Sequence, residues 1–554
     1  MRRMCSVAVV SSVTVALFSA GVAHASVSAG GPARMGRAPG IAWGPCSDPS
    51  LRKDHAQCGS MSVPLDYSDP HGQQIKIAVS RIKHTATGRH YQGVILENPG
   101  GPGASGLAYD TYIISTLKAE GYGAAVADYD WIGFDPRGVG SSKPAISCIP
   151  DYFKPDRPSY VPHTKAQADN WLARSQSYAQ ACNAASPVQW ALLRNMTTHD
   201  VAMDVDRIRQ ALGQRQITYY GISYGTDIGQ VYATLFPSHV KRLILDSNVN
   251  PLRDGYQDFN LDQDSPYNRN EDIWLGWIAK YHKTYHLGST ETAVRKLFYA
   301  TEARLAAHPA GGQVGPDEWT DVFIYAAYYQ STWVPLAEAF AAWVHQHNTA
   351  AAKYLVGLYR GLDAVGYDNG FAVYLSVLCT DSHWPLNWNI WARGSRALYR
   401  KAPFATWWNT WSNAPCLFWP APSTQPVRVN GSHLKSALLF DETLDAATPF
   451  ESSLVVRKLF PHSVLAAELG GTTHGATLNG DKCMDGTLAA YLETGALPPR
   501  KSHAKWDKTC PAQPQPVPPV PPAKGHIQRA NDLITPHPGG IPPLGIAALD
   551  SPSR

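Results

Sequence analysis

The chain has 554 residues, which is enough for two or three folded units at roughly 150 residues per domain. Hydrophobic residues make up 44 % and charged residues 17 %, so the chain can bury a sizeable core and is not disordered as a whole. The formal net charge is only +4, which argues against nucleic acid as the main partner.

The N-terminus has the features of a secretory signal. Two arginines follow Met1, an apolar run covers residues 7–22, and a small-x-small site ends at Ala25. We therefore expect a signal peptide over 1–25, a secreted mature protein and a flexible N-terminus over 26–40. The apolar run is short for a membrane span, and no later stretch approaches that length, so no integral span is expected after the signal is removed.

The cysteines support export. Cys5 leaves with the signal, and the even number that remains fits an oxidised, exported protein. Neither C-x-x-C nor H-E-x-x-H occurs, so we predict no metal and no cofactor. The grouping along the chain favours disulfides between neighbours in order, namely Cys46–Cys58, Cys148–Cys182, Cys379–Cys416 and Cys483–Cys510.

Short apolar runs alternate with helix-like segments through most of the chain. Such alternation predicts an α/β fold, with a mostly parallel central sheet flanked by helices. One helix-like stretch, 226–235, directly follows the third strand. The expected strands are 93–96, 126–134, 217–220, 243–245, 437–440 and 464–469.

Residues 251–430 differ from the rest because they are rich in Trp and Tyr and indicate several helices, at 273–282, 293–307, 319–329 and 336–345. We interpret this segment as a helical lid inserted between two parts of the core, 41–250 and 431–510. From Pro511 to the end the chain is rich in proline, which predicts an extended tail over 511–554.

The sequence Gly221-Ile222-Ser223-Tyr224-Gly225 lies between a predicted strand and a predicted helix. A strand that turns sharply into a helix holds its central residue in a strained conformation, and small residues two positions before and after leave room for the turn. The pentapeptide alone is a weak signal, but its flanking elements strengthen it. We predict that Ser223 is a nucleophile.

A glycine-rich loop, Asn98 to Gly106, follows the first predicted core strand. It formally matches a dinucleotide-binding pattern, with Asp128 and Asp130 near the acidic position, but its two prolines and the lack of a helix directly after it argue against that reading. A better interpretation is an oxyanion loop, in which Gly100 or Gly101 supplies one backbone N–H and Tyr224 supplies the other.

A serine nucleophile needs an imidazole to take its proton and a carboxylate to orient the imidazole. In a sheet of this type the chain order is serine, acid, histidine. His474 follows the last predicted strand, and Asp445 follows the strand before it. We predict that His474 is the base and Asp445 the acid. Asp441 is the competing candidate because it ends the same strand.

Asp135 and Arg137 end another predicted strand, in D-P-R-G-V-G-S. We expect a buried pair that shapes the loop beside the site rather than one that takes part in chemistry.

Five motifs now occur in order: N-P-G-G-P-G (98–103), D-P-R-G-V-G-S (135–141), Y-G-I-S-Y-G-T (220–226), L-D-A-A-T-P (444–449) and T-H-G (473–475). With them the chain resembles the secreted bacterial tripeptidyl aminopeptidases, within the proline-iminopeptidase-like α/β-hydrolase serine peptidases, over residues 41–510. The resemblance implies an α/β-hydrolase fold, the same triad, and cleavage of short peptides from free N-termini. Thr473 and Ser247 stand where the family often has glycine.

The expected activity is therefore that of a serine exopeptidase acting on peptides through an acyl-enzyme. Recognition of a free amino terminus needs a carboxylate in the lid, where Glu271 and Asp272 are candidates, close to Asp262 and Asp264. The alternative is a carboxylesterase or lipid-ester hydrolase that uses the same triad. A non-catalytic binding protein is disfavoured while all three triad candidates are present. The oligomeric state is not indicated by the sequence.

Overall fold

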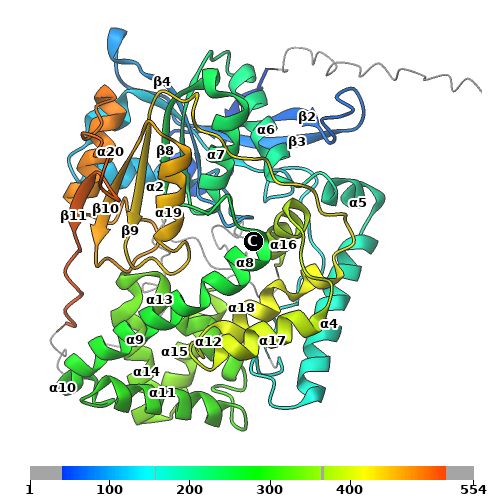
Figure 1. Cartoon of the computed structure of the whole chain (residues 1–554), viewed down its shortest axis with the longest axis vertical. Helices are drawn as coiled ribbons and strands as arrows, with labels where there is room; N and C mark the ends of the chain where they lie inside the picture. The colour runs from blue at the N-terminus through cyan, green and yellow to red at the C-terminus, as the bar shows by residue number, and fades with distance from the viewer. Residues whose placement is uncertain (1–39, 156, 363–366, 520–554) are drawn as a thin grey trace, which may run out of the picture. The chain divides into compact units, whose positions relative to one another are not determined.

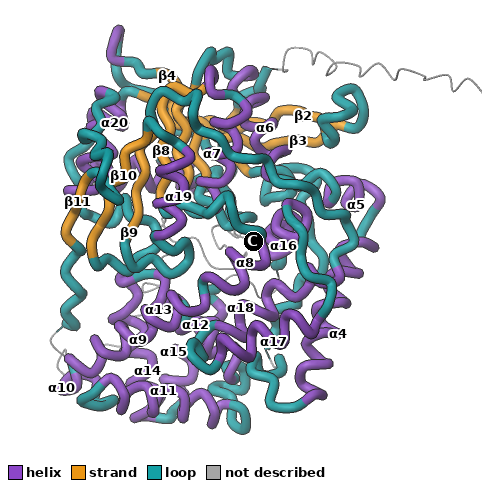
Figure 2. The backbone as a smooth tube through the Cα atoms, viewed as in Figure 1, coloured by secondary structure: helices purple, strands orange, loops and turns teal. Residues whose placement is uncertain are grey.

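The structure, a computed structural model, describes residues 40–155, 157–362 and 367–519. The predicted signal peptide, residues 26–39 of the predicted flexible N-terminus and the tail beyond 519 lie outside these residues. The central element is a seven-stranded sheet in the order β11-β10-β9-β8-β7-β4-β5, with every neighbouring pair parallel (Figures 1 and 2). The α/β prediction is thus confirmed. The strands are β4 (Gly93–Asn98), β5 (Tyr129–Ile132), β7 (Ile217–Ile222), β8 (Val240–Asp246), β9 (Ala437–Glu442), β10 (Ser463–Leu469) and β11 (Lys508–Pro511).

A small antiparallel sheet adjoins the β5 end of the main sheet, where Ser80 N–H donates to Gly133 O at 2.9 Å. The sequence pattern does not predict this second sheet. The expected strand 126–134 is also shorter in the structure, because Val126 belongs to a helix. The strands of this sheet are β1 (Gly44–Pro45), β2 (Gln57–Pro64), β3 (Gln74–Arg81) and β6 (Phe134–Asp135).

Successive side chains of the main sheet enter two separate cores. Tyr219 packs in one core and Tyr220 in the other, as do Leu439 and Leu438. This follows from the two-residue period of a strand whose faces are both covered. One core holds side chains of α2 (Tyr109–Ala119), α3 (Gly123–Ala127) and α20 (Lys482–Thr494). The other holds those of α6 (Thr198–Ala211), α7 (Tyr224–Leu235) and α19 (Glu451–Leu459).

The lid consists of helices, drawn in green to yellow in Figure 1. The expected helix 319–329 is divided into two, and the others are present with shifted ends. No helix among the described residues is both long and apolar enough to cross a membrane. The lid helices are α8 (Gly255–Gln257), η3 (Asp258–Asp262), α9 (Asp264–Lys280), α10 (His282–Tyr285), α11 (Glu291–Leu305), α12 (Pro316–Phe323), α13 (Tyr325–Tyr328), η4 (Gln330–Thr332), α14 (Trp333–Gln346), α15 (Thr349–Arg360), α16 (Asn369–Asp381), α17 (Trp388–Tyr399), α18 (Thr406–Asn413) and η5 (Ala414–Phe418).

A segment that precedes β7 also packs on the lid. Trp171 of α4 (Lys165–Ala184) stacks between Tyr160 and Trp411, at ring-centroid distances of 5.2 and 5.7 Å. Residues outside 251–430 therefore also pack as part of the lid. The remaining short helices are α1 (Pro49–Lys53), η1 (Gly88–His90), α5 (Pro187–Leu193) and η2 (Pro237–His239).

Four disulfides join the eight cysteines of the described residues, and the pairs are those expected from their order along the chain. The last of them, Cys483–Cys510, connects α20 to the edge strand β11.

The described part of the proline-rich tail runs from β11 towards the lid helices (Figure 1). Gln513 N–H donates to Glu468 Oε1 at 3.0 Å, and Trp277 Nε1–H of α9 donates to Pro516 O at 2.9 Å. The tail thus links the edge of the sheet to the lid.

Arg157, which lies just before α4, allows a test of how this part of the chain is held to the lid. Its guanidinium is buried and contacts Glu318 Oε1 at 3.2 Å and Asp321 Oδ2 at 2.5 Å. Arg157→Met leaves two buried carboxylates without their cation, so we expect the free energy of unfolding to fall by about 3–5 kcal/mol in urea titrations.

The control is Lys165→Met, which removes an exposed ion pair with Asp169 and should change that free energy by less than about 1 kcal/mol. Equal effects of the two substitutions would show that the buried ion pairs of Arg157 with Glu318 and Asp321 do not stabilise the fold.

Candidate active site

Ser223 occupies the sharp turn between β7 and α7. Its backbone angles, φ 56° and ψ −128°, are rare for a residue with a side chain. A Cβ on Gly221 would lie 2.2 Å from Gly225 O, and one on Gly225 would lie 2.2 Å from Asn98 O. Both positions therefore require glycine, because a side chain would collide with the neighbouring backbone. This agrees with the prediction that small residues two positions before and after Ser223 leave room for the turn.

His474 and Asp445 form a buried pair, with 2.8 Å between His474 Nδ1 and Asp445 Oδ2. Asp445 Oδ1 also accepts the N–H groups of Ala447 and Thr448, at 2.8 and 3.0 Å. The A-A-T-P loop thus fixes the carboxylate. With Nδ1–H donating to Asp445, Nε2 is left as the proton acceptor of the imidazole.

Asp441, the competing acid, has a different partner. Its Oδ2 accepts the hydroxyl of Ser453 at 2.5 Å, and burial raises its pKa well above the usual value. Of the two candidates, the structure brings only Asp445 to His474.

The turn after β8 connects the nucleophile turn to the loop of His474. Asp246 O accepts Ser223 N–H at 3.0 Å, and its Oδ1 accepts Ala476 N–H at 2.8 Å. Ser247 Oγ accepts Gly475 N–H at 2.8 Å. Ser247, which stands where the family often has glycine, therefore supports the loop of His474. This role of Asp246 is not predictable from the sequence, because no local motif marks a side chain that accepts a hydrogen bond from a residue 230 positions away.

The glycine-rich loop lies against the nucleophile turn, and one of its predicted donors is already used. Gly100 N–H donates to Asn98 Oδ1 at 2.9 Å, so this amide is not free for an oxyanion. A Cβ on Gly100 would lie 2.5 Å from Ile222 O and 2.9 Å from Tyr224 N. Gly100 therefore serves close packing, and Gly101 and Tyr224 remain as the candidate donors.

Asp135 and Arg137 are both buried, but they do not form the expected pair. Arg137 binds Asp204 through two nitrogens, each at 2.8 Å. Asp135 instead accepts Ser105 Oγ–H at 2.5 Å and Ser141 N–H at 2.7 Å. The pair prediction is wrong because Asp204, on α6, reaches the guanidinium from another part of the chain.

The lid carboxylates have partners within the lid. Glu271 is fully buried, accepts Tyr299 O–H at 2.8 Å, and has its pKa raised well above the usual value by burial. Asp272 pairs with Arg295 at 2.5 Å. Asp264 is also fully buried, and burial raises its pKa to about 8. Recognition of a substrate amine by Glu271 or Asp272 stays a prediction.

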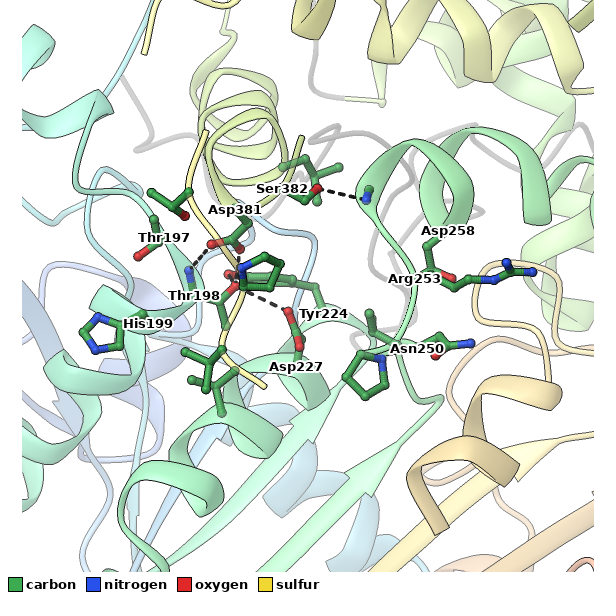
Figure 3. A pocket seen from close by; sticks show the side chains of 18 of the residues that line it. Thr197, Thr198, His199, Tyr224, Asp227, Asn250, Arg253, Asp258, Asp381 and Ser382 are labelled. Carbon is green, nitrogen blue, oxygen red and sulfur yellow. Dashed lines mark hydrogen bonds between the residues drawn. The ribbon is translucent and has the colours of Figure 1, made fainter. Parts of the chain in front are cut away.

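A pocket lies beside the nucleophile turn, between the start of α7, the segment 249–259 and the end of α16 (Figure 3). The Tyr224 hydroxyl is 2.7 Å from Thr198 Oγ1, and Thr198 N–H donates to Asp381 at 2.8 Å. Burial raises the pKa of Asp227 to about 6 and that of Asp381 to about 8. The pocket is thus less negative at neutral pH than its composition indicates. Ser223, Asp445 and His474 do not line it.

Comparison with known proteins gives two family matches. Residues 93–300 match the α/β-hydrolase fold, and residues 402–510 match TAP-like protein.

Three curated relatives cover most of the chain. Tripeptidyl aminopeptidase of Streptomyces coelicolor is 40 % identical over 487 residues, which is 86 % of this chain and 87 % of the relative. Serine protease Hip1 of Mycobacterium tuberculosis is 30 % identical and covers 85 % of this chain and 92 % of the relative. Carboxylesterase B of the same organism is 29 % identical, over 80 % of this chain and 85 % of the relative.

The protonation of Asp264 gives a prediction about stability. The folded chain keeps the proton up to about pH 8, whereas the unfolded chain loses it near pH 4, so this carboxyl's contribution to stability is complete at acid pH and declines as pH rises. Asp264→Asn removes that decline. We expect the stability of this variant, relative to the unsubstituted protein, to increase steadily from pH 5 to pH 8, by at most about 1.4 kcal/mol of unfolding free energy per pH unit. The measurement is the difference in melting temperature between the two proteins at each pH.

A melting-temperature difference that stays constant over this range would show that Asp264 is ionised in the folded protein.

Proposed function

This chain belongs to the tripeptidyl aminopeptidase family of α/β-hydrolases, and we propose that it uses Ser223, Asp445 and His474 to release short peptides from the free N-termini of peptide substrates. Its relatives confirm the family resemblance carried by the five motifs, and the chain is a hydrolase and a serine exopeptidase. The assignment of the three residues rests on one observation. A strained serine, a buried carboxylate and the imidazole bonded to it follow the C-terminal ends of β7, β9 and β10.

In the proposed reaction, His474 Nε2 takes the proton of Ser223 Oγ as the oxygen attacks the substrate carbonyl carbon. The tetrahedral intermediate collapses, the peptide C–N bond breaks, and His474 returns the proton to the leaving amine. Water then gives a proton to His474 and attacks the acyl carbon, the ester C–O bond breaks, and His474 returns the proton to Ser223 Oγ as the released short peptide leaves with a new carboxylate. Asp445 holds the imidazole in the required tautomer and stabilises its protonated form.

The negative charge that develops on the carbonyl oxygen needs donors that are already in position. We assign this role to the amides of Gly101 and Tyr224. Tyr224 is the first residue of α7, so its N–H is one of the groups that a helix start leaves without an intrahelical acceptor.

We also propose that the enzyme is exported. Four disulfides support an oxidising location, and the sequence of residues 1–25 supports a signal peptide.

Hydrolysis of carboxylic esters is the second candidate activity. It is favoured by the 29 % identity to carboxylesterase B, and it would use the same three residues.

The first test compares substrates and triad variants of the purified mature enzyme. We expect hydrolysis of tripeptidyl amides with a free N-terminus, and slower turnover of the same peptides after N-acetylation. Ser223→Ala and His474→Ala should lower kcat by about 10⁴-fold or more, and Asp445→Asn by about 10⁴-fold. Asp441→Asn is the matched control and should retain activity, since Asp441 contacts Ser453 instead of His474.

Turnover of short-chain aryl esters without any amide turnover would favour the esterase and reject the exopeptidase. Full activity of Ser223→Ala would remove the triad assignment.

Glu271 provides the test of N-terminal recognition. Burial raises the pKa of Glu271, so this carboxyl has to be ionised by the substrate ammonium that it binds. A hydrogen bond to a charged group contributes roughly 1.5–3 kcal/mol, so Glu271→Gln should raise KM for free tripeptidyl amides by about 10-fold or more. It should leave KM for N-acetylated peptides unchanged. Asp272→Asn is the comparison, because Asp272 already has Arg295 as its cation and should have a smaller effect. Equal effects of Glu271→Gln on free and acetylated substrates would exclude recognition of the amine.

A further inference from the structure

Lid helix α9 contacts both loops that carry the proposed acid and base. We call residues 443–449 the acid loop and residues 470–477 the His loop. The Nδ2 amide of Asn270 donates to Leu444 O of the acid loop at 2.9 Å, and it lies 3.2 Å from Thr472 O of the His loop. The same nitrogen is 3.0 Å from Ala327 O of α13. One side chain thus joins two loops of the core to a second lid helix.

We infer that Asn270 is a positioning residue for the triad, and that through it the lid sets the alignment of His474 with Asp445. This inference rests on the proposed function of those two residues. Asn270 is completely buried, and each carbonyl it contacts lies close in sequence to a functional group. Leu444 directly precedes Asp445, and Thr472 is two residues before His474.

Neighbouring lid residues hold the same two loops. The Arg269 guanidinium donates to Asp445 O at 3.1 Å, and its Nε donates to Asn270 Oδ1 at 3.1 Å. On the other side, His474 N–H donates to Tyr328 O at 2.8 Å, and Gln330 N–H donates to Thr473 Oγ1 at 3.3 Å. The main chain of the base therefore depends on lid carbonyl and amide groups as well as on the sheet.

The two amide hydrogens of Asn270 are shared among three carbonyl oxygens. Loss of the amide removes this donor from Ala327 O and Thr472 O, whereas Leu444 O keeps a donor in the Arg269 guanidinium. The His loop is then free to shift relative to the acid loop. A displacement of about 1 Å in a catalytic group can lower the rate by about 100-fold. The substrate contacts of the site need not change, so the effect should be on kcat.

The test uses Asn270→Ala and, as a variant that keeps the shape, Asn270→Asp, which retains the oxygen bonded by Arg269 and loses both donors. The matched control is Asn413→Ala. Asn413 is an equally buried lid amide whose Nδ2 donates to Phe259 O and Asn409 O, at 3.1 and 3.0 Å, and its hydrogen bonds within the described residues go to neither loop.

We expect both Asn270 variants to lower kcat for a tripeptidyl amide by about 100-fold, with KM within about 3-fold of the original, while Asn413→Ala changes kcat by less than 3-fold at a similar melting temperature. An effect of Asn270→Asp no larger than that of Asn413→Ala would overturn the inference. So would a loss that matches the unfolded fraction measured by circular dichroism.

A second readout does not depend on peptide hydrolysis. In a Ser223→Ala background, the downfield proton resonance of His474 Nδ1–H reports its hydrogen bond to Asp445. We expect this resonance to shift or disappear in Asn270→Asp and to persist in Asn413→Ala. An unchanged resonance would overturn the inference. A changed resonance in an enzyme that hydrolyses no peptide would support the positioning role while removing the proposed function.

Discussion

The hydrogen bond between His474 and Asp445 is the interaction on which the arrangement of the site depends. Both side chains are almost without solvent contact, so the pair is held by buried groups on every side. Its partners come from distant parts of the chain: the A-A-T-P loop fixes the carboxylate, and the turn after β8 supports the loop of the imidazole. Such a pair requires that three strand ends of a parallel sheet lie side by side.

The strain at Ser223 is compensated by contacts that only glycine permits. The turn has room for its geometry because Gly221 and Gly225 bring backbone against backbone, and Gly100 brings the neighbouring loop close to the same turn. Burial is also costly for the acids around this region, and it raises the pKa of Asp441 and Asp246. Their bonds to Ser453 and to the N–H groups of Ala476 and Thr477 show that these carboxyls serve the architecture.

The lid contacts the loops of Asp445 and His474 directly, so it does more than cover the site. Helix α9 carries Glu271, the proposed contact to the substrate amine, and Asn270, which contacts the acid and His loops. Substrate recognition and alignment of the triad would thus share one helix. The tail contact of Pro516 with Trp277 lies on the same helix, so the edge of the sheet is linked to it as well.

Local sequence by itself determined the parallel sheet, the turn at Ser223 and the positions of Asp445 and His474 after successive strands, because these depend on periodicity, on glycine spacing and on loops that directly follow strands. It also indicated the disulfide pairs. The tertiary structure alone decided that Asp445 rather than Asp441 meets His474, that Gly100 has no free amide, that Arg137 pairs with Asp204, and that Asn270 and Asp246 support the site. Each of these is a hydrogen bond or ion pair whose partner is set by the direction of a side chain in the folded chain, and no local pattern encodes that direction.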